Sequence, residues 1–234
     1  MWLTHKVGEK ILVKFIIPDR EWLALEPMGR LYTHPNPFVR FVSIYRLRIV
    51  LHALRIRGQV ERILDAGCGN GVLMPSLSRV AKLVVGVDVD KGALAVAKNM
   101  IRRSSQCGYV ELVCCDIHKL PFRNKVFDYC VSVSVLDHLK DIKLALQNIK
   151  NSLKTAGSLI VGIMPPLPTP LAYIWSVLAA GHRYIFAEHV NTYVECLSAI
   201  AEHFTITSIK GPLGIPLFYV AVTATLEPRE DLNT

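Results

Sequence analysis

A glycine-rich turn between an apolar run and a helical pattern is the most distinctive chemical feature of the sequence. The turn, Asp65-Ala66-Gly67-Cys68-Gly69-Asn70-Gly71, follows directly on the apolar residues at 62–66. Glycines let a backbone approach a ligand closely, and the N-terminus of a following helix suits an anionic group. A dinucleotide site needs Gly-x-Gly-x-x-Gly or Ala, but here the third glycine comes one position early and Val72 occupies the small-residue position. The spacing therefore disfavours NAD and FAD.

Acidic residues follow the next two apolar runs. Asp88 closes the run 82–88, nineteen residues after Gly69, where a carboxylate can accept hydrogen bonds from both hydroxyls of a ribose. Asp116 follows the run 109–114. A fourth block runs from Phe127 to Leu139, and a fifth from Asn151 to Ile160. The order and separation of these blocks indicate a nucleoside site at the ends of parallel strands.

In these blocks the chain resembles the class I S-adenosylmethionine-dependent methyltransferases, which carry an acidic residue two positions before Gly-x-Gly-x-Gly. The resemblance covers residues 60–165 closely, the last two strands loosely, and says little about residues 1–55. It implies that S-adenosylmethionine is the cofactor and that a set of strand-end residues binds it: Asp65, Gly67, Cys68, Gly69, Asp88, Val89, Asp116, Ile117, Ser132 and Val133.

Each of these residues also has a structural interpretation. Asp65 could cap the turn, Asp88 could be a solvated acid at a strand end, and Asp128 is interpreted as a structural contact. In the family, the loop that holds His138 borders the methyl acceptor, so we predict His138 as a catalytic residue. The alternative is a helix-start cap or a surface histidine.

The elements that must hold these residues alternate between strand and helix. Strand-length apolar runs are predicted at 62–66, 82–88, 109–114, 127–133, 157–163, 204–209 and 216–225. Helical patterns lie between them at 71–80, 91–103, 138–154 (with a stop at Gly157) and 190–202. This predicts an α/β fold: a three-layer, Rossmann-like methyltransferase fold with a mostly parallel seven-stranded sheet.

We expect an N-terminal helical extension at 1–58, the methyltransferase domain at 59–226 and a tail at 227–234. Asn36-Pro37 predicts the start of a helix that runs to Leu54. Arginines on this apolar helix leave two alternatives: it packs on the sheet edge, or it lies against a membrane or the substrate.

An insert at 164–189 follows the fifth predicted strand. The stretch 155–182 has no Asp, Glu, Lys or Arg, but its prolines exclude a membrane span. Ligands of this fold bind at the end where the insert begins, so we predict a lid in which Trp175, Tyr184 and His189 line the substrate. An apolar lid favours an apolar acceptor, such as a quinone, isoprenoid or lipid; the alternative is a buried helix or dimer contact.

Absent motifs narrow the reaction. The chain lacks the Asn- or Asp-Pro-Pro-Tyr motif of enzymes that methylate base amino groups, and no cysteine lies in a nucleophile block for pyrimidine carbon methylation. We therefore expect transfer to an O or C atom of a small acceptor. The alternatives are an RNA methyltransferase that uses the basic N-terminal region and a subunit that binds S-adenosylmethionine without catalysis.

Composition sets the remaining expectations. The 234 residues are 51% hydrophobic and 20% charged, which excludes a disordered chain. The formal net charge is +8, and residues 1–60 hold ten basic and four acidic side chains, a surface that attracts phosphates of nucleic acid or lipid. The six cysteines form no Cys-x-x-Cys pair, so no metal site is expected. With no signal peptide, we expect a cytoplasmic monomer or homodimer, either free or peripheral to a membrane.

Overall fold

One central sheet of seven strands organises the part of the chain that the computed structural model describes, residues 5–7, 10–18, 20–25, 32–57, 60–105, 107–164, 190–211 and 219–226. The strand order is β6-β5-β4-β7-β8-β10-β9. The strands are β4 (Val60–Ala66), β5 (Ala81–Asp88), β6 (Val110–Cys114), β7 (Phe127–Val133), β8 (Leu153–Ile163), β9 (Thr205–Lys210) and β10 (Val220–Thr225). All seven predicted strands are confirmed.

The direction of the strands fixes where a ligand can bind. β4, β5, β6, β7 and β8 pair in parallel, whereas β10 runs antiparallel to both β8 and β9. The chain moves outward from β4 through β5 to β6, then crosses back to β7 on the other side of β4. The carboxyl ends of β4 and β7 therefore form the switch point at which open α/β sheets bind ligands.

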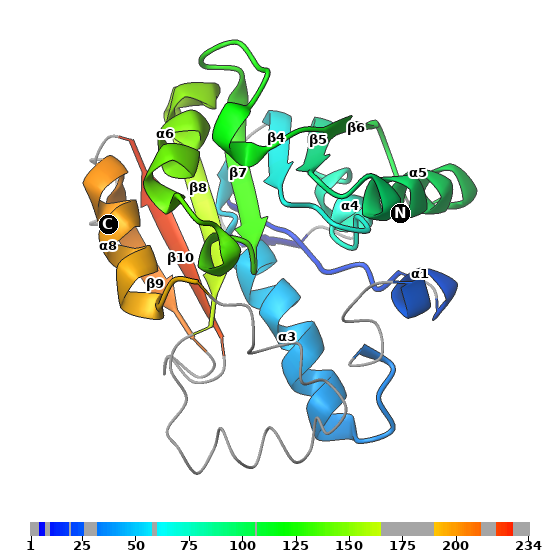
Figure 1. The fold of residues 1–234 in the computed structure, drawn as a ribbon. Helices are drawn as coiled ribbons and strands as arrows, with labels where there is room; N and C mark the ends of the chain where they lie inside the picture. The colour runs from blue at the N-terminus through cyan, green and yellow to red at the C-terminus, as the bar shows by residue number, and fades with distance from the viewer. Residues whose placement is uncertain are drawn as a thin grey trace.

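Helices cover both faces of this sheet (Figure 1). The helices are α1 (Arg20–Leu25), α3 (Pro37–Ala53), α4 (Met74–Leu77), α5 (Lys91–Arg103), α6 (Ile142–Ser152) and α8 (Tyr193–His203). Apolar side chains of α3, α4 and α5 join one buried cluster, and those of α6 and α8 join another. The result is the expected three-layer α/β architecture.

Helix α6 is shorter than the pattern predicted. It starts at Ile142 because Asp141 caps it, the Asp141 carboxylate accepting a 2.9 Å hydrogen bond from the Leu144 backbone N–H. Residues 136–138 form a separate short 3₁₀ helix, η2. The predicted stop at Gly157 was wrong, because α6 ends at Ser152 and β8 begins at Leu153.

The N-terminal segment contains strands as well as helices, so its description as a helical extension was incomplete. β1 (His5–Val7), β2 (Lys10–Leu12) and β3 (Ile56–Arg57) pair as a small antiparallel sheet. The predicted helix after Asn36 is confirmed as α3, since the Asn36 side chain accepts a 2.9 Å hydrogen bond from the Phe38 N–H and Pro37 occupies the first turn. Its contacts with β8 and β10 show that one side of α3 packs on the sheet, as the first alternative predicted, and they leave open whether its other side meets a membrane or the substrate.

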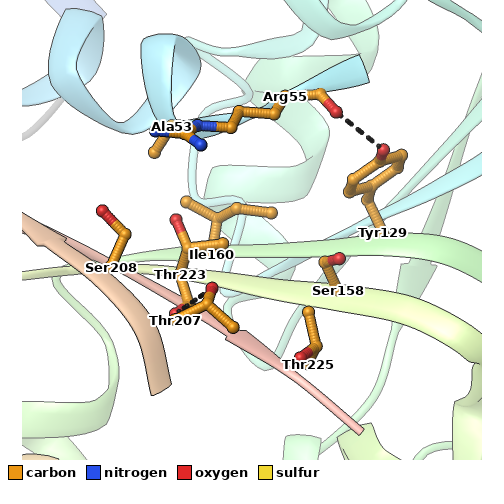
Figure 2. Close-up of a pocket in the computed structure, with 9 residues that line it drawn as sticks. All are labelled: Ala53, Arg55, Tyr129, Ser158, Ile160, Thr207, Ser208, Thr223 and Thr225. Atoms are coloured by element: carbon orange, nitrogen blue, oxygen red, sulfur yellow. Dashed lines mark hydrogen bonds between the residues drawn. The ribbon is translucent and has the colours of Figure 1, made fainter. Parts of the chain in front are cut away.

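The antiparallel end of the sheet leaves a small hollow under the end of α3. It has a volume of about 40 Å³, and Figure 2 shows it between the residues that follow α3 and side chains of β7, β8, β9 and β10. Its lining comprises Ala53, Arg55, Tyr129, Ser158, Ile160, Thr207, Ser208, Thr223 and Thr225.

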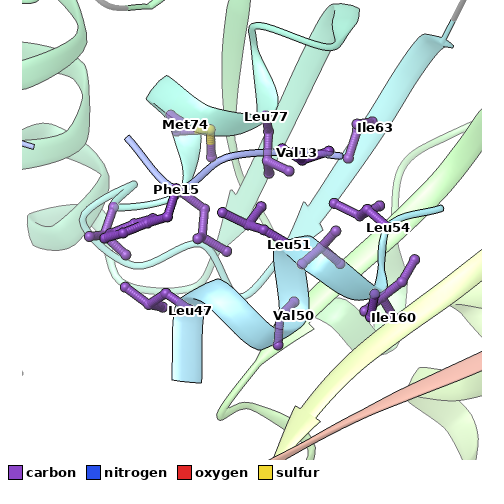
Figure 3. Close-up of a cluster of buried hydrophobic side chains, with 14 of the residues drawn as sticks. Val13, Phe15, Leu47, Val50, Leu51, Leu54, Ile63, Met74, Leu77 and Ile160 are labelled. Atoms are coloured by element: carbon purple, nitrogen blue, oxygen red, sulfur yellow. The ribbon is translucent and has the colours of Figure 1, made fainter. Parts of the chain in front are cut away.

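The N-terminal segment packs into the main core. Figure 3 shows Val13 and Phe15 beside Leu51 of α3 and Leu77 of α4, with Ile63 of β4 nearby. All five side chains are buried. Burying an aliphatic or aromatic side chain contributes about 1.5–3 kcal/mol, so these contacts bind the N-terminal segment to the sheet as one body.

Several predicted features lie outside the described residues. They are the insert beyond Met164, with Trp175, Tyr184 and His189, and the tail 227–234. In the described part of the chain, no helix combines the length and apolar character needed to cross a membrane.

Candidate functional site

The glycine turn folds back on the end of β5. Gly67, Gly69 and Gly71 all have positive φ, at 78°, 51° and 74°. The N–H groups of Gly67 and Cys68 both donate to the Val87 carbonyl, at 2.9 and 3.0 Å. Only glycine adopts this left-handed region without strain, which explains the three glycines.

The space around two of these glycines defines the two sides of the turn. A Cβ on Gly67 would lie 2.3 Å from the nearer methyl carbon of Val135, so Gly67 is required for the turn to pack against the loop after β7. A Cβ on Gly69 would have no atom within 4 Å. Gly69 therefore faces open space on the side where a ligand can approach the backbone.

Asp88 joins the turn to the end of β5. One carboxylate oxygen accepts from the Gly69 N–H at 2.8 Å, and the other accepts from the Asp90 N–H at 2.9 Å. Each carboxylate oxygen has two lone pairs, so Asp88 can accept two further hydrogen bonds while it holds the turn. This fits the predicted role toward the two hydroxyls of a ribose.

The helix N-terminus that was expected to bind an anionic group does not follow the glycine turn directly. Two residues, Val72 and Leu73, separate Gly71 from Met74, and α4 is a single turn of four residues. A helix dipole grows from many aligned peptides, so α4 offers an anionic group little.

Val89 and Asp116 lie on the β5–β6 side of the turn, where the resemblance places the adenine. Val89 is 64% exposed directly after β5. The Asp116 carboxylate accepts from the His118 backbone N–H at 2.9 Å and contacts its Nδ1 at 2.6 Å through Oδ1. These contacts lower the pKa of Asp116, while Oδ2 has no partner in the described part of the chain. The adjacent Ile117 is buried.

Other predicted cofactor residues support the site from beneath. Asp65 and Ser132 are buried, and the Ser132 hydroxyl donates to the Ala66 carbonyl at 3.0 Å, which joins the ends of β7 and β4. Burial and the Asp65 carboxylate raise the pKa of the Cys68 thiol, so Cys68 stays neutral. Val133, half-buried, ends β7. The geometry supports a positioning role for Asp65 and Ser132.

His138 lies in η2, at the end of the loop that follows β7. Its side chain is 38% exposed, and its Nε2 is 3.9 Å from a carboxylate oxygen of Asp137. Asn191 fixes η2, because its side chain donates to the carbonyls of Leu136 and Leu139 at 3.1 and 2.6 Å. His138 is therefore held beside the switch point with its ring reachable from solvent.

Sequence reasoning missed how the N-terminal segment contacts the glycine turn. The Trp22 indole N–H donates to the Asn70 carbonyl at 2.8 Å, and the Asn70 side chain donates to the Leu25 carbonyl. Helix α1 thus lies against the turn from the N-terminal side. An amphipathic pattern at 20–25 could have predicted the helix, but not its partner.

A second missed feature is a buried polar cluster at the carboxyl ends of β7 and β8. The hydroxyls of Ser134 and Tyr219 are 3.0 Å apart, and Arg46 of α3 donates to the Tyr32 hydroxyl. Burial raises the pKa of Tyr219 far above its usual range. Ser134 has φ +54°, a conformation that is uncommon outside glycine and clusters at functional sites.

Metal chemistry has no support in the part of the chain that the structure describes. No group of three or more His, Cys, Asp or Glu side chains there could hold an ion. Burial raises the pKa of the Cys107 thiol to about 11 and of the Cys196 thiol to about 12. These thiols are therefore neutral at physiological pH.

Comparison with known proteins agrees with this site. Residues 64–161 match a family model described as a methyltransferase domain. The chain is 25% identical over 182 residues to a ubiquinone biosynthesis O-methyltransferase of Coxiella burnetii, covering 78% of this chain and 71% of that protein.

Solved structures share the fold. N-methyltransferase NodS of Bradyrhizobium japonicum, in complex with S-adenosylhomocysteine, superposes with a TM-score of 0.60 at 22% identity, over 89% of this chain and 96% of that one. The [4+2]-cyclase SpnF superposes with a TM-score of 0.62 at 19% identity, over 78% and 80%. The fold therefore hosts more than one reaction, and the chemistry must be argued from the site.

Proposed function

We propose that this chain, which belongs to the class I S-adenosylmethionine-dependent methyltransferases, methylates an oxygen atom of a small apolar, quinone-like acceptor. The observation that carries the proposal is the likeness to a ubiquinone biosynthesis O-methyltransferase over 78% of the chain, together with the donor site at the β4–β7 switch point. The insert 164–189 is largely apolar, and its part from 164 to 182 has no Asp, Glu, Lys or Arg, which agrees with an acceptor of this kind.

The donor site holds S-adenosylmethionine through the groups described above. Asp88 would bind the ribose, Val89 and Asp116 would contact the adenine, and the open side of Gly69 would let the backbone approach the methionine part. The open space at Gly69 and the unused oxygen of Asp116 fit these roles. When bound, the sulfonium supplies a methyl group whose leaving group departs neutral.

The transfer then depends on alignment. The acceptor oxygen forms the new bond to the methyl carbon as the bond from sulfur to that carbon breaks, and the hydroxyl proton must leave. We assign His138 to accept that proton on a ring nitrogen. The nearby carboxylate of Asp137, 3.9 Å from Nε2, would stabilise the imidazolium that forms.

The test uses the purified full chain and radiolabelled methyl donor. Host extract is separated after reaction into lipid, RNA, protein and small-molecule fractions. We expect label in the lipid fraction, stable to mild base as an ether is and absent with Gly69→Val. Label in RNA would support the nucleic-acid alternative, and intact donor with no transfer would support a binding subunit; either result refutes the proposal.

His138 is tested separately with the labelled lipid product. We expect His138→Gln to lower kcat at least tenfold with donor affinity unchanged, since general-base catalysis contributes about 10²–10⁴-fold. His203→Gln is the control, because His203 lies at the end of α8 that is farther along the helix from Asn191, the residue that contacts η2. An unchanged kcat for His138→Gln across pH 6–9 would remove His138 from the mechanism.

A further inference from the structure

Helix α3 presents a stripe of aromatic and basic side chains on the side away from the core. Phe38, Phe41, Tyr45, Arg48 and His52 follow one another at intervals of three and four residues, which places them on one face of the helix. Phe38 is 45% exposed and Phe41 is 58% exposed. The rings of Phe41 and Tyr45 lie 5.7 Å apart, and Tyr45 is half-buried against the core, so it anchors the exposed ring of Phe41.

Positive charge extends this stripe onto a second element. Lys210 ends β9 and pairs with Ala221 of β10, the strand against which α3 packs. Burial, Arg48 and Lys210, in that order, lower the pKa of His52. We call these residues, Phe38, Phe41, Tyr45, Arg48 and His52 with Lys210, the α3 face.

The sequence around the α3 face contains no negative charge. Between residues 27 and 60 there is no Asp or Glu, and there are six arginines: Arg30, Arg40, Arg46, Arg48, Arg55 and Arg57. A surface built from this segment therefore has a positive potential that acidic neighbours in the chain do not cancel.

The hollow under the end of α3 lies beyond His52, the last residue of the stripe. Arg55 follows His52 by three residues, and its guanidinium lies over the hollow near Ala53, as Figure 2 shows. No hydrogen bond or ion pair of that guanidinium occurs in the part of the chain that the structure describes. Hydroxyls of Ser and Thr make up most of the polar lining, and no acid takes part. A guanidinium above hydroxyl groups can donate hydrogen bonds to the oxygens of a phosphate.

We propose that the α3 face docks on the surface of an anionic lipid bilayer. Phe38 and Phe41 would enter the boundary between headgroups and acyl chains, while Arg48, Lys210 and Arg55 would contact lipid phosphates. The aromatic half of α3 projects past the carboxyl ends of the parallel strands, the edge that holds the donor site (Figure 1). This inference rests on the proposed function in one respect, that an apolar acceptor would be dissolved in the bilayer.

A bilayer fits the α3 face better than a second copy of the chain. In a two-fold dimer the same patch meets itself, so Arg48 and Lys210 of one copy would approach those of the other, and like charges repel. An anionic bilayer instead offers negative charge and an apolar layer together, which match the two halves of the stripe.

The test is flotation of the full chain with vesicles of phosphatidylcholine and phosphatidylglycerol at 7:3, against phosphatidylcholine alone, at 50 and 300 mM salt. We expect binding to the anionic vesicles that weakens with salt. Each basic residue near such a surface changes affinity about fivefold, so Arg48→Glu should weaken binding roughly 25-fold. Phe41→Ser should weaken it while salt dependence remains.

Matched controls separate a local surface from general charge or apolarity. Arg123→Glu makes the same charge change at an exposed position remote from α3, and Val194→Ser removes a side chain that is 65% exposed on α8. Both should bind vesicles within twofold of the unmodified chain. Circular dichroism confirms that each variant is folded.

Four results would overturn the proposal: no vesicle binding at 50 mM salt, equal losses in the controls, binding of RNA but not vesicles, or self-association that Arg48→Glu abolishes. Methyl transfer to the acceptor in detergent is measured in parallel. Transfer without vesicle binding would refute docking and leave the proposed function standing. Vesicle binding without transfer would refute the proposed function and leave docking standing.

Discussion

The carboxylate of Asp88 offers the sharpest test of the donor site. Asp88→Asn keeps the shape of the side chain but replaces one acceptor oxygen with an N–H₂ group and removes the charge. The N–H groups of Gly69 and Asp90 and the two ribose hydroxyls then compete for one amide oxygen. A hydrogen bond to a charged group is worth about 1.5–3 kcal/mol, so losing one should weaken S-adenosylmethionine and S-adenosylhomocysteine about 10- to 150-fold.

The assay is titration calorimetry at constant pH and salt, with Asp90→Asn as the control. Asp90 lies two residues away and caps α5, its carboxylate accepting from the Gly92 and Ala93 N–H groups at 2.7 and 3.1 Å. Asparagine caps helices as well as aspartate does, so this variant removes the same charge but should bind the donor within twofold.

A donor analogue separates direct contact from loss of the turn. S-adenosylhomocysteine lacking its ribose 2′-hydroxyl should bind the unmodified chain at least fivefold more weakly, yet bind Asp88→Asn about as well as the complete ligand does. If Asp88→Asn discriminates between the two ligands as strongly as the unmodified chain, Asp88 only holds Gly69 and the ribose assignment is refuted.

Three further outcomes are expected. Gly69→Ala should still fold, with the free energy of unfolding lowered by about 1–2 kcal/mol, because φ is 51° and no atom obstructs a Cβ. The variant should nevertheless lose donor binding in the same titration. Retained affinity would show that the turn does not approach the ligand. Burial raises the pKa of Asp128, but hydrogen bonds from Lys154 and the Arg62 backbone N–H outweigh burial and lower the pKa below 3.8. The ionised Asp128 therefore stabilises the fold above pH 3.8, and that stabilisation is lost as the pH falls through the lowered pKa. Asp128→Asn should flatten the acid limb of a plot of stability against pH, and an unchanged limb would contradict the assignment. Trp175→Ala and Tyr184→Ala should slow methyl transfer but change donor affinity only a few-fold, and loss of donor binding in both would make the insert part of the core rather than a lid.

The pattern of apolar runs and turns was enough to predict the sheet. Buried parallel strands are short and continuously apolar, which marks their positions without tertiary information. The end of α6 was harder to predict from the sequence. The helical pattern continues through residues 152–154, but Leu153 pairs with β7 and therefore belongs to β8. Local propensity does not include that pairing energy.

The candidate site divides in the same way. Gly67, Gly69 and Asp88 could be identified from sequence because the chemistry of a nucleoside ligand demands these residue types at strand ends. The contacts of Trp22 with Asn70 and of Ser134 with Tyr219 join residues 48 and 85 positions apart, and no local pattern encodes such a pair.

The sequence by itself therefore determined the class of fold and the order of the strands along the chain, and it predicted the residues that would meet the donor. Tertiary structure decided which of those residues face open space, like Gly69, and which are buried, like Asp65 and Ser132. It also joined the N-terminal segment to the glycine turn and paired Lys210 with β10, the strand against which α3 packs. The physical reason is range: propensity and hydrophobic periodicity act over a few residues, whereas burial and the charges that surround a group depend on segments that only folding brings together.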